Sequence, residues 1–376
     1  MTGSSKLMIL NFNTKKMKYS KLTYYLLAIL CIMATSCVSD GVMDECPDSS
    51  KSKQTVKDAR VSLVLNFAFN SSVTRAGESD GDTTEGEESE RKIKDVHIYA
   101  FQNNQFKEEV KYVSIFGTDG ENTRMIQGTL TETYDSNNAV KFVVIVNGEN
   151  KKIITANKPS NYTTPEALYN QLVFEFNSND DWSTNIPMAG MCEIRPLAEG
   201  ENVAKLALTR AVAKVNVTVN EGKGLDNFRI TEIRLCNYNT SGYCASNDLS
   251  EPYIPTDVQQ STTPISSGTI TDAEMNAYEN HLYLPEHKNI GVTDKKAYLE
   301  IDAMVKGESK TYTLAFAQNG NPHDVLRNYM YVFNIRSVKM DIDVGIDYEV
   351  AIWDEKEIEV APVSYTHLTL PTNREV

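Results

Sequence analysis

A regular alternation of large apolar residues with smaller or polar ones runs through positions 61–69 of this chain. The large apolar members are Val61, Leu63, Leu65, Phe67 and Phe69. Since successive side chains of a strand point to opposite faces of a sheet, this period of two predicts a β-strand with one buried face. Shortly beyond, residues 76–90 contain seven acidic residues, no basic residue and no large apolar one. They predict an exposed loop.

Short apolar segments bounded by turn residues continue along the rest of the chain. One helix is expected over residues 165–172, because Thr164 is a suitable N-cap and Pro165 would occupy the first helical position. The apolar segments predict strands at 95–101, 141–147, 172–176, 205–208, 211–219, 228–235, 297–304, 311–317, 329–335, 348–353 and 357–360. Many strands with scarcely any helix predict an all-β protein of the β-sandwich type.

Residues 1–36 have the features of a lipoprotein signal peptide. Lysines precede a mostly apolar run, 22–34, which is as long as a signal-peptide core and too short to span a bilayer. The run ends in Ala34-Thr35-Ser36-Cys37, which resembles a lipobox. We therefore expect lipid on the Cys37 thiol and a true start at Met17. The alternative is plain secretion, with Cys37 in a disulfide.

The exported chain would begin with a polar stretch and keep several cysteines. Residues 37–60 predict a tether between the membrane and the fold. Export permits disulfides, and Cys236 and Cys244 stand eight residues apart around a turn-like sequence. These two cysteines either close a hairpin or stay as buried thiols. The pairing of Cys46 and Cys192 is equally open, because sequence does not determine connectivity.

Length, charge and motifs exclude several classes of function. A chain of 376 residues is long enough for two domains of about 150 residues each. Its formal net charge of −14 argues against nucleic acid as a partner, since phosphate binding requires a basic face. Its His and Cys residues do not stand at zinc-ligand spacings, and no nucleophile-elbow or nucleotide-loop motif occurs. We therefore expect no metal, no cofactor, no catalytic residue and no enzymatic activity.

Five segments, taken in order, resemble the fimbrillins, the pilins of type V pili. These segments are Ile186–Gly190, Leu208–Val215, Leu282–Glu286, the Leu326–Tyr331 approach to a late strand, and Val350–Trp353 followed by Ile358–Val360. The resemblance covers residues 37–361. It implies a fold of two tandem transthyretin-like β-sandwiches, which would comprise residues 76–207 and 208–362.

The resemblance also implies a route of maturation. Fimbrillins travel as lipoproteins to the outer membrane, where a trypsin-like protease cuts after an arginine just past the first strand. Here residues 61–75 match the removable strand, and the Arg75–Ala76 bond matches the cut. Loss of the strand would expose a hydrophobic groove and unpaired sheet edges. Without the resemblance, Arg75 would be taken as an ordinary loop arginine.

A C-terminal strand of the next subunit then fills this groove by β-strand addition, which gives a head-to-tail filament. The residues that match this donor strand are Tyr348, Val350, Ile352, Trp353, Ile358 and Val360. For Trp353 the alternative is a core position in its own domain. Residues 363–376 do not resemble the end of a fimbrillin, and we expect them to be non-native.

The leading interpretation is a shaft or tip subunit of a type V pilus, located at the outer membrane and cell surface. Its partners would be other pilin subunits, the maturation protease and an adhesion receptor that the sequence does not identify. One alternative is the membrane-anchor subunit of the same pilus, which keeps its lipid and its first strand. Another is a glycan-binding surface lipoprotein, which would expose Trp platforms for sugar stacking, whereas this chain has only 2 Trp.

Overall fold

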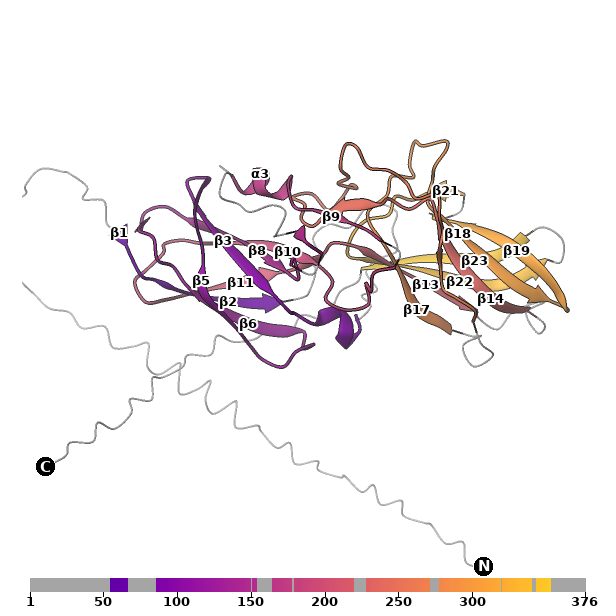
Figure 1. Cartoon of the computed structure of the whole chain (residues 1–376), viewed down its shortest axis with the longest axis horizontal. Helices are drawn as coiled ribbons and strands as arrows, with labels where there is room; N and C mark the ends of the chain where they lie inside the picture. Colours follow the sequence, from indigo (N-terminus) through magenta and orange to yellow (C-terminus); the bar gives the residue numbers. More distant parts are fainter. Residues whose placement is uncertain are drawn as a thin grey trace, which may run out of the picture. The chain divides into compact units, whose positions relative to one another are not determined.

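The computed structural model describes residues 55–66, 86–149, 151–153, 164–177, 179–219, 228–270, 277–318, 320–339 and 343–352. Nearly all regular structure in these residues is β-strand, arranged in four larger sheets and three two-stranded ones (Figure 1). The expected all-β class is therefore confirmed. The division into two transthyretin-like domains stays a prediction.

The first two larger sheets come from the N-terminal part of the described chain. One has the strand order β12 (Thr209–Arg210), β10 (Met188–Ile194), β8 (Val140–Val146), β3 (Val96–Gln102) and β4 (Gln105–Glu109). The other has the order β11 (Glu201–Ala207), β2 (Arg60–Asn66), β6 (Thr123–Thr129) and β5 (Lys111–Phe116). A single buried cluster takes side chains from both sheets, among them Ile98, Val144, Ile126 and Leu206. The two sheets therefore pack face to face as a sandwich.

The other two larger sheets come from the C-terminal part. One has the order β17 (Ala277–Leu284), β13 (Ala213–Val219), β22 (Tyr329–Lys339) and β23 (Asp343–Ile352). The other has the order β16 (Ile265–Ser266), β14 (Phe228–Cys236), β18 (Tyr298–Val305) and β19 (Glu308–Ala315). Val215, Phe333, Ile233 and Ile301 belong to one buried cluster, so these two sheets also share a core. The two-stranded sheets pair β1 (Thr55–Val56) with β7 (Tyr134–Asp135), β9 (Val173–Glu175) with β15 (Ser241–Tyr243), and β20 (Ala317–Gln318) with β21 (Asn321–Pro322).

Strand β8 illustrates how sequence and packing correspond. It is almost continuously apolar rather than alternating, which is typical of a strand buried on both faces. Phe142 and Val144 belong to the sandwich core with β2, whereas Val143 and Ile145 belong to the cluster that continues into the C-terminal sheets. The five-stranded sheet is therefore covered on both of its faces.

Helix α3 (Pro165–Tyr169) confirms the predicted cap, since Thr164 Oγ1 accepts a hydrogen bond from the Ala167 N–H at 3.0 Å. Cys236 and Cys244 are buried free thiols, the second of the two alternatives. Within the predicted tether, β1 pairs with β7 and Ala59 is buried, so its last residues belong to the fold.

Candidate functional site: strand β2 and its neighbours

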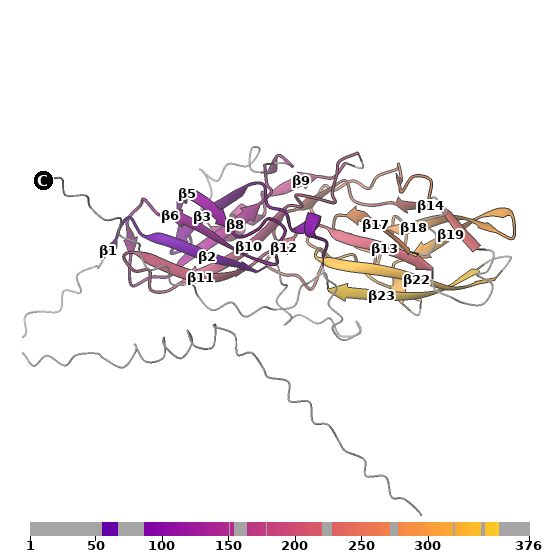
Figure 2. The ribbon, with the colours of Figure 1, turned by 90° about the horizontal axis from the view of Figure 1, so that it is seen from below.

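Strand β2 contains the start of the predicted removable strand and lies inside its sheet, not at an edge (Figure 2). It runs parallel to β11 and antiparallel to β6, and all seven of its residues have a partner on each side. Within the described part of the chain, β11 pairs with no other strand. Removal of β2 would leave β11 without a partner and would unpair one edge of β6. Both consequences are costly, because buried N–H and C=O groups need hydrogen-bond partners.

The two faces of β2 have different environments. The Val61 side chain is buried in the sandwich core together with Ile126 and Leu206 from the two flanking strands. Burial of a side chain of this kind contributes about 1.5–3 kcal/mol. On the opposite face, the Ser62 hydroxyl donates a hydrogen bond to Glu201 Oε1 at 2.7 Å. The place of β2 is thus an apolar slot on the core side with a polar rim on the other side.

The chain downstream of the predicted cleavage loop is held firmly to the fold. The described chain resumes at Gly86 and forms a short 3-10 helix, η2 (Glu88–Arg91). The Arg91 guanidinium donates to the carbonyl oxygens of Gly86 and Gly120, the latter at 2.6 Å. The Ile93 N–H donates to Asp119 Oδ1 at 3.1 Å. The segment that follows the loop is therefore anchored independently of β2.

Glu90, in η2, forms a buried cluster with two residues from the C-terminal sheets. Its Oε1 lies 2.8 Å from the Lys214 ammonium of β13 and accepts a hydrogen bond from the Tyr283 hydroxyl of β17. Its Oε2 accepts the Glu87 N–H at 2.8 Å. The predicted exposure of residues 76–90 is wrong at this end of the segment, because Glu90 is fully buried and Lys214 is 4% exposed. A partner distant in sequence makes this burial favourable.

The charges in this cluster determine the protonation of Glu90. Burial by itself raises the pKa of the Glu90 carboxyl. The Lys214 ammonium and the hydrogen bonds from Lys214, Tyr283 and the Glu87 backbone outweigh burial, so this pKa lies below its usual value. Burial, and next the adjacent Glu90 carboxylate, raise the pKa of Tyr283, which stays protonated as a donor. The cluster is thus an ion pair with a neutral phenol.

The first part of the predicted donor strand lies in β23, at the end of its sheet. It pairs antiparallel with β22 alone, with Tyr348 opposite Phe333, Val350 opposite Tyr331 and Ile352 opposite Tyr329. Within the described residues, its other edge has no partner strand. Trp353, Ile358 and Val360 lie outside the described residues.

The remaining predicted site residues divide into two groups. Leu63 and Leu65 belong to β2, at the positions opposite Ile126 and Arg124 of β6, whereas the others lie outside the described part of the chain. The predicted residues outside are Cys37, Phe67, Phe69, Arg75 and Ala76.

The segments quoted for the resemblance meet in the structure. Met188 pairs with Arg210 where β10 meets β12, and β13 lies between β17 and β22. The Arg327 guanidinium donates to Glu286 Oε2 at 2.6 Å, and both side chains are buried. Segments that are far apart in sequence are thus joined by strand pairing and by a buried ion pair. A lysine or arginine within an apolar strand, such as Lys214, is the sequence signal that could have indicated these buried ion pairs.

The described residues offer little for metal chemistry. Among them, no group of three or more His, Cys, Asp and Glu side chains is arranged to hold a metal ion. In this same part of the chain, no helix is long and apolar enough to cross a membrane. The features that distinguish this site are strand pairing and buried charge.

Comparisons with known proteins point to one family. A family model described as "Fimbrillin-A associated anchor proteins Mfa1 and Mfa2" matches residues 43–359. None of the curated proteins matches the chain.

Solved structures with similar folds have low sequence identity to this chain. A proposed cell adhesion protein from Parabacteroides distasonis has a TM-score of 0.52 and 16% identity, covering 81% of this chain and 99% of that one. One from Bacteroides eggerthii has a TM-score of 0.52 and 13% identity, covering 80% and 98%. The tip fimbrial protein Mfa3 from Porphyromonas gingivalis has a TM-score of 0.48 and 15% identity, covering 78% and 100%. At such identities the likeness to the first two shows a shared fold.

Proposed function

Because the chain belongs to the family of fimbrillin-A associated anchor proteins Mfa1 and Mfa2, we propose that it is a subunit of a type V pilus that assembles by exchange of β-strands. The family match confirms the resemblance to fimbrillins that five segments of the sequence indicated. Members of this family are structural proteins of the fimbrium at the cell surface, and the chain is therefore not an enzyme.

The observation that carries the proposal is the position of β2 between two strands. A protease that cuts the Arg75–Ala76 bond leaves the upstream segment attached to the fold only by non-covalent contacts. These are the pairing and core contacts of β2, the pairing of β1 with β7 and the burial of Ala59. Its departure opens a slot between β11 and β6, and an incoming strand restores the lost pairs if it runs parallel to β11 and antiparallel to β6. Such an addition gains both main-chain hydrogen bonds and pockets for apolar side chains.

The Glu90 cluster supports the same sequence of events. The new N-terminus at Ala76 would lie twelve residues before Glu88, where η2 begins, and η2 is held by Lys214 and Tyr283. The cut can therefore release β2 without loosening the chain that leads into β3. The protease is of the trypsin type, because it cuts after an arginine.

The incoming strand is the C-terminal strand of another subunit. Residues 343–352 pair with β22 at the edge of their own sheet, and no other described strand pairs with them. Residues 353–360 follow β23 in sequence, and Trp353, Ile358 and Val360 among them supply the apolar side chains for the slot. If residues 348–352 also enter the slot, they must first leave β22. A head-to-tail contact of this kind does not close and gives a filament.

Export completes the proposed route. Lipid on Cys37 holds the precursor at the outer membrane, and cleavage frees the subunit to join the fimbrium. In the fimbrium the subunit serves adhesion to a surface receptor.

A second candidate function is the membrane anchor of the same pilus. The family description, which names anchor proteins, favours it. An anchor would keep the Cys37 lipid. It would also keep β2 between β11 and β6, where β2 lies in the structure.

N-terminal sequencing of the protein sheared from cells separates the two candidates. A first residue of Ala76 supports the polymerising subunit. A blocked terminus at Cys37, on protein that stays with the membrane, supports the anchor. A terminus within the described strands, for example inside β3, would contradict both.

A further inference from the structure

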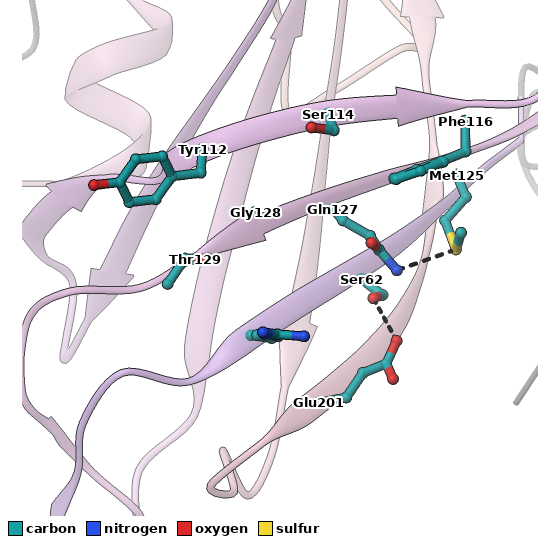
Figure 3. A pocket seen from close by; sticks show the side chains of 10 residues that line it. Ser62, Tyr112, Ser114, Phe116, Met125, Gln127, Gly128, Thr129 and Glu201 are labelled. Atoms are coloured by element: carbon teal, nitrogen blue, oxygen red, sulfur yellow. Dashed lines mark hydrogen bonds between the residues drawn. The ribbon is translucent and has the colours of Figure 1, made fainter. Parts of the chain in front are cut away.

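The outward face of the β2 sheet carries a second feature, a groove of about 590 Å³ on the side away from the sandwich core (Figure 3). The groove is lined from all four strands of the sheet. Its volume is within the range of pockets that bind small molecules, about 300–1,000 Å³. It lies over paired strands, so it offers side chains rather than free backbone groups.

Polar and aromatic side chains are arranged in rows across this groove. Ser62, Gln127 and Ser114 stand opposite one another on β2, β6 and β5. The Gln127 amide makes only a long contact to the Met125 sulfur, at 3.9 Å, among the described residues. Its carbonyl oxygen and the Ser114 hydroxyl therefore remain available to a ligand. Phe116, 44% exposed, stands beside this row.

Tyr112 is held outward by an irregular backbone. Its side chain is 83% exposed, more than any other large apolar or aromatic side chain of the described residues. Its φ of 53° lies in the left-handed region, which is costly for a bulky residue. It also lies in a β-bulge, where the register with β6 shifts between Lys111 and Ser114. Bulges of this kind re-aim side chains next to functional sites.

The charges of the groove favour a neutral ligand. Arg60 and Glu201 stand opposite each other at one end and balance in charge. The chain as a whole is acidic, with a net charge of −14, which disfavours polyanions. A ligand that stacks an apolar face on an aromatic ring and hydrogen-bonds to hydroxyl and amide groups has the chemistry of a sugar.

We propose that the groove between Tyr112 and Phe116, on the outward face of the β2 sheet, binds a neutral oligosaccharide. Tyr112 and Phe116 supply the stacking surfaces, and Gln127, Ser114 and Thr129 supply hydrogen-bond groups. Tyr112 and Phe116 are four residues apart on β5. A regular strand would span about 13 Å over this distance, and the bulge shortens it, which suits a short chain of sugar rings. The groove is complete only while β2, or a strand that replaces it, occupies the slot.

The proposal is tested on the uncleaved full-length precursor, so that it does not depend on polymerisation. The probe is a printed array of neutral and sialylated oligosaccharides, followed by titration calorimetry with each neutral sugar that binds. Tyr112→Ala should weaken binding at least tenfold, and Tyr112→Phe should restore it, because the phenyl ring keeps the stacking face. Phe116→Ala and Gln127→Ala should each weaken binding at least threefold. Ile290→Ala, at another exposed apolar residue, is the matched control and should leave binding unchanged.

Three results would overturn the proposal. The first is that the protein binds no neutral sugar of the array, the second is that it binds sialylated sugars alone, and the third is that Tyr112→Ala leaves binding intact. Thermal melting of each variant shows that the fold is kept, which is expected for side chains this exposed. None of these results bears on strand exchange, since the precursor keeps β2 throughout.

Discussion

In the proposed strand exchange, β2 is the strand that leaves and β23 is part of the strand that is donated. The two strands differ in the number of neighbours with which they pair. β2 is flanked on both sides and its Val61 is buried in a sandwich core. Among the strands that the structure describes, β23 is at the end of its sheet and pairs with β22 alone. An inner strand leaves behind two unpaired edges and an apolar slot when it goes. When an edge strand leaves, only one neighbouring strand loses its hydrogen-bond partners.

The difference explains why a cut in a loop would change the behaviour of the whole subunit. Before the cut, every edge next to β2 is satisfied within the chain. After it, the most stable way to satisfy β11 and β6 again is to accept a strand from outside. Substitutions in three regions of the molecule test this difference between the two strands, and the greatest loss of stability is expected at Lys214.

The chain that remains after the cut must stay in place, and the buried ion pair between Glu90 and Lys214 holds η2 to β13. Lys214→Met leaves the buried Glu90 carboxyl without its cation, which should lower the free energy of unfolding by about 3–5 kcal/mol. Chemical denaturation of the precursor measures this loss. Lys310→Met, which removes an exposed ion pair with Glu308, is the control and should cost under about 1 kcal/mol. Equal losses in the two variants would contradict the anchoring role of the cluster.

Proline substitutions should distinguish an inner strand from an edge strand. Every N–H of β2 points to β11 or β6, so Ser62→Pro and Leu63→Pro should each leave a buried partner unpaired, at a cost of about 1–3 kcal/mol. At the neighbouring β23 positions Glu349 and Val350, one N–H points away from β22, so one of the two proline variants should be nearly neutral. Denaturation of the four variants tests this. A marked loss at both β23 positions would show that β23 is flanked on both sides.

Acid should weaken the Glu90 cluster specifically. Because the pKa of Glu90 is lowered in the fold, its stabilising contribution is present above the ordinary carboxyl value of 4.5 and is lost as pH falls through the lower folded value. Glu90→Gln should therefore be less stable than the wild-type precursor near neutral pH, and the difference should shrink in acid. Melting curves at a series of pH values measure it. A difference that is constant with pH would exclude the ion pair as its source.

The sequence predicted β2 well because its period of two is strong and one face is buried. It did not predict β5 and β6, where Gly128 interrupts the pattern and polar residues face the outer groove. A Cβ at Gly128 would come within 2.4 Å of Val110 Cγ1, so this glycine serves close packing that no local pattern signals. The burial of Glu90 could not be predicted either, because it depends on Lys214 and Tyr283, more than a hundred residues further along the chain. Local acidity alone indicated an exposed loop.

Locking β2 in its slot tests the central claim most directly. Ser62 and Gln127 stand opposite each other on β2 and β6, so Ser62→Cys combined with Gln127→Cys allows a disulfide between the two strands. Because close and wide pairs alternate along the ladder, the adjacent pair Leu63 and Ile126 is tested in parallel. After trypsin treatment, strand exchange at β2 predicts that the oxidised variant is cut at Arg75 but stays monomeric, and that reduction releases SDS-resistant ladders. Ladders from the oxidised, locked protein as strong as those of the wild type would contradict strand exchange at β2.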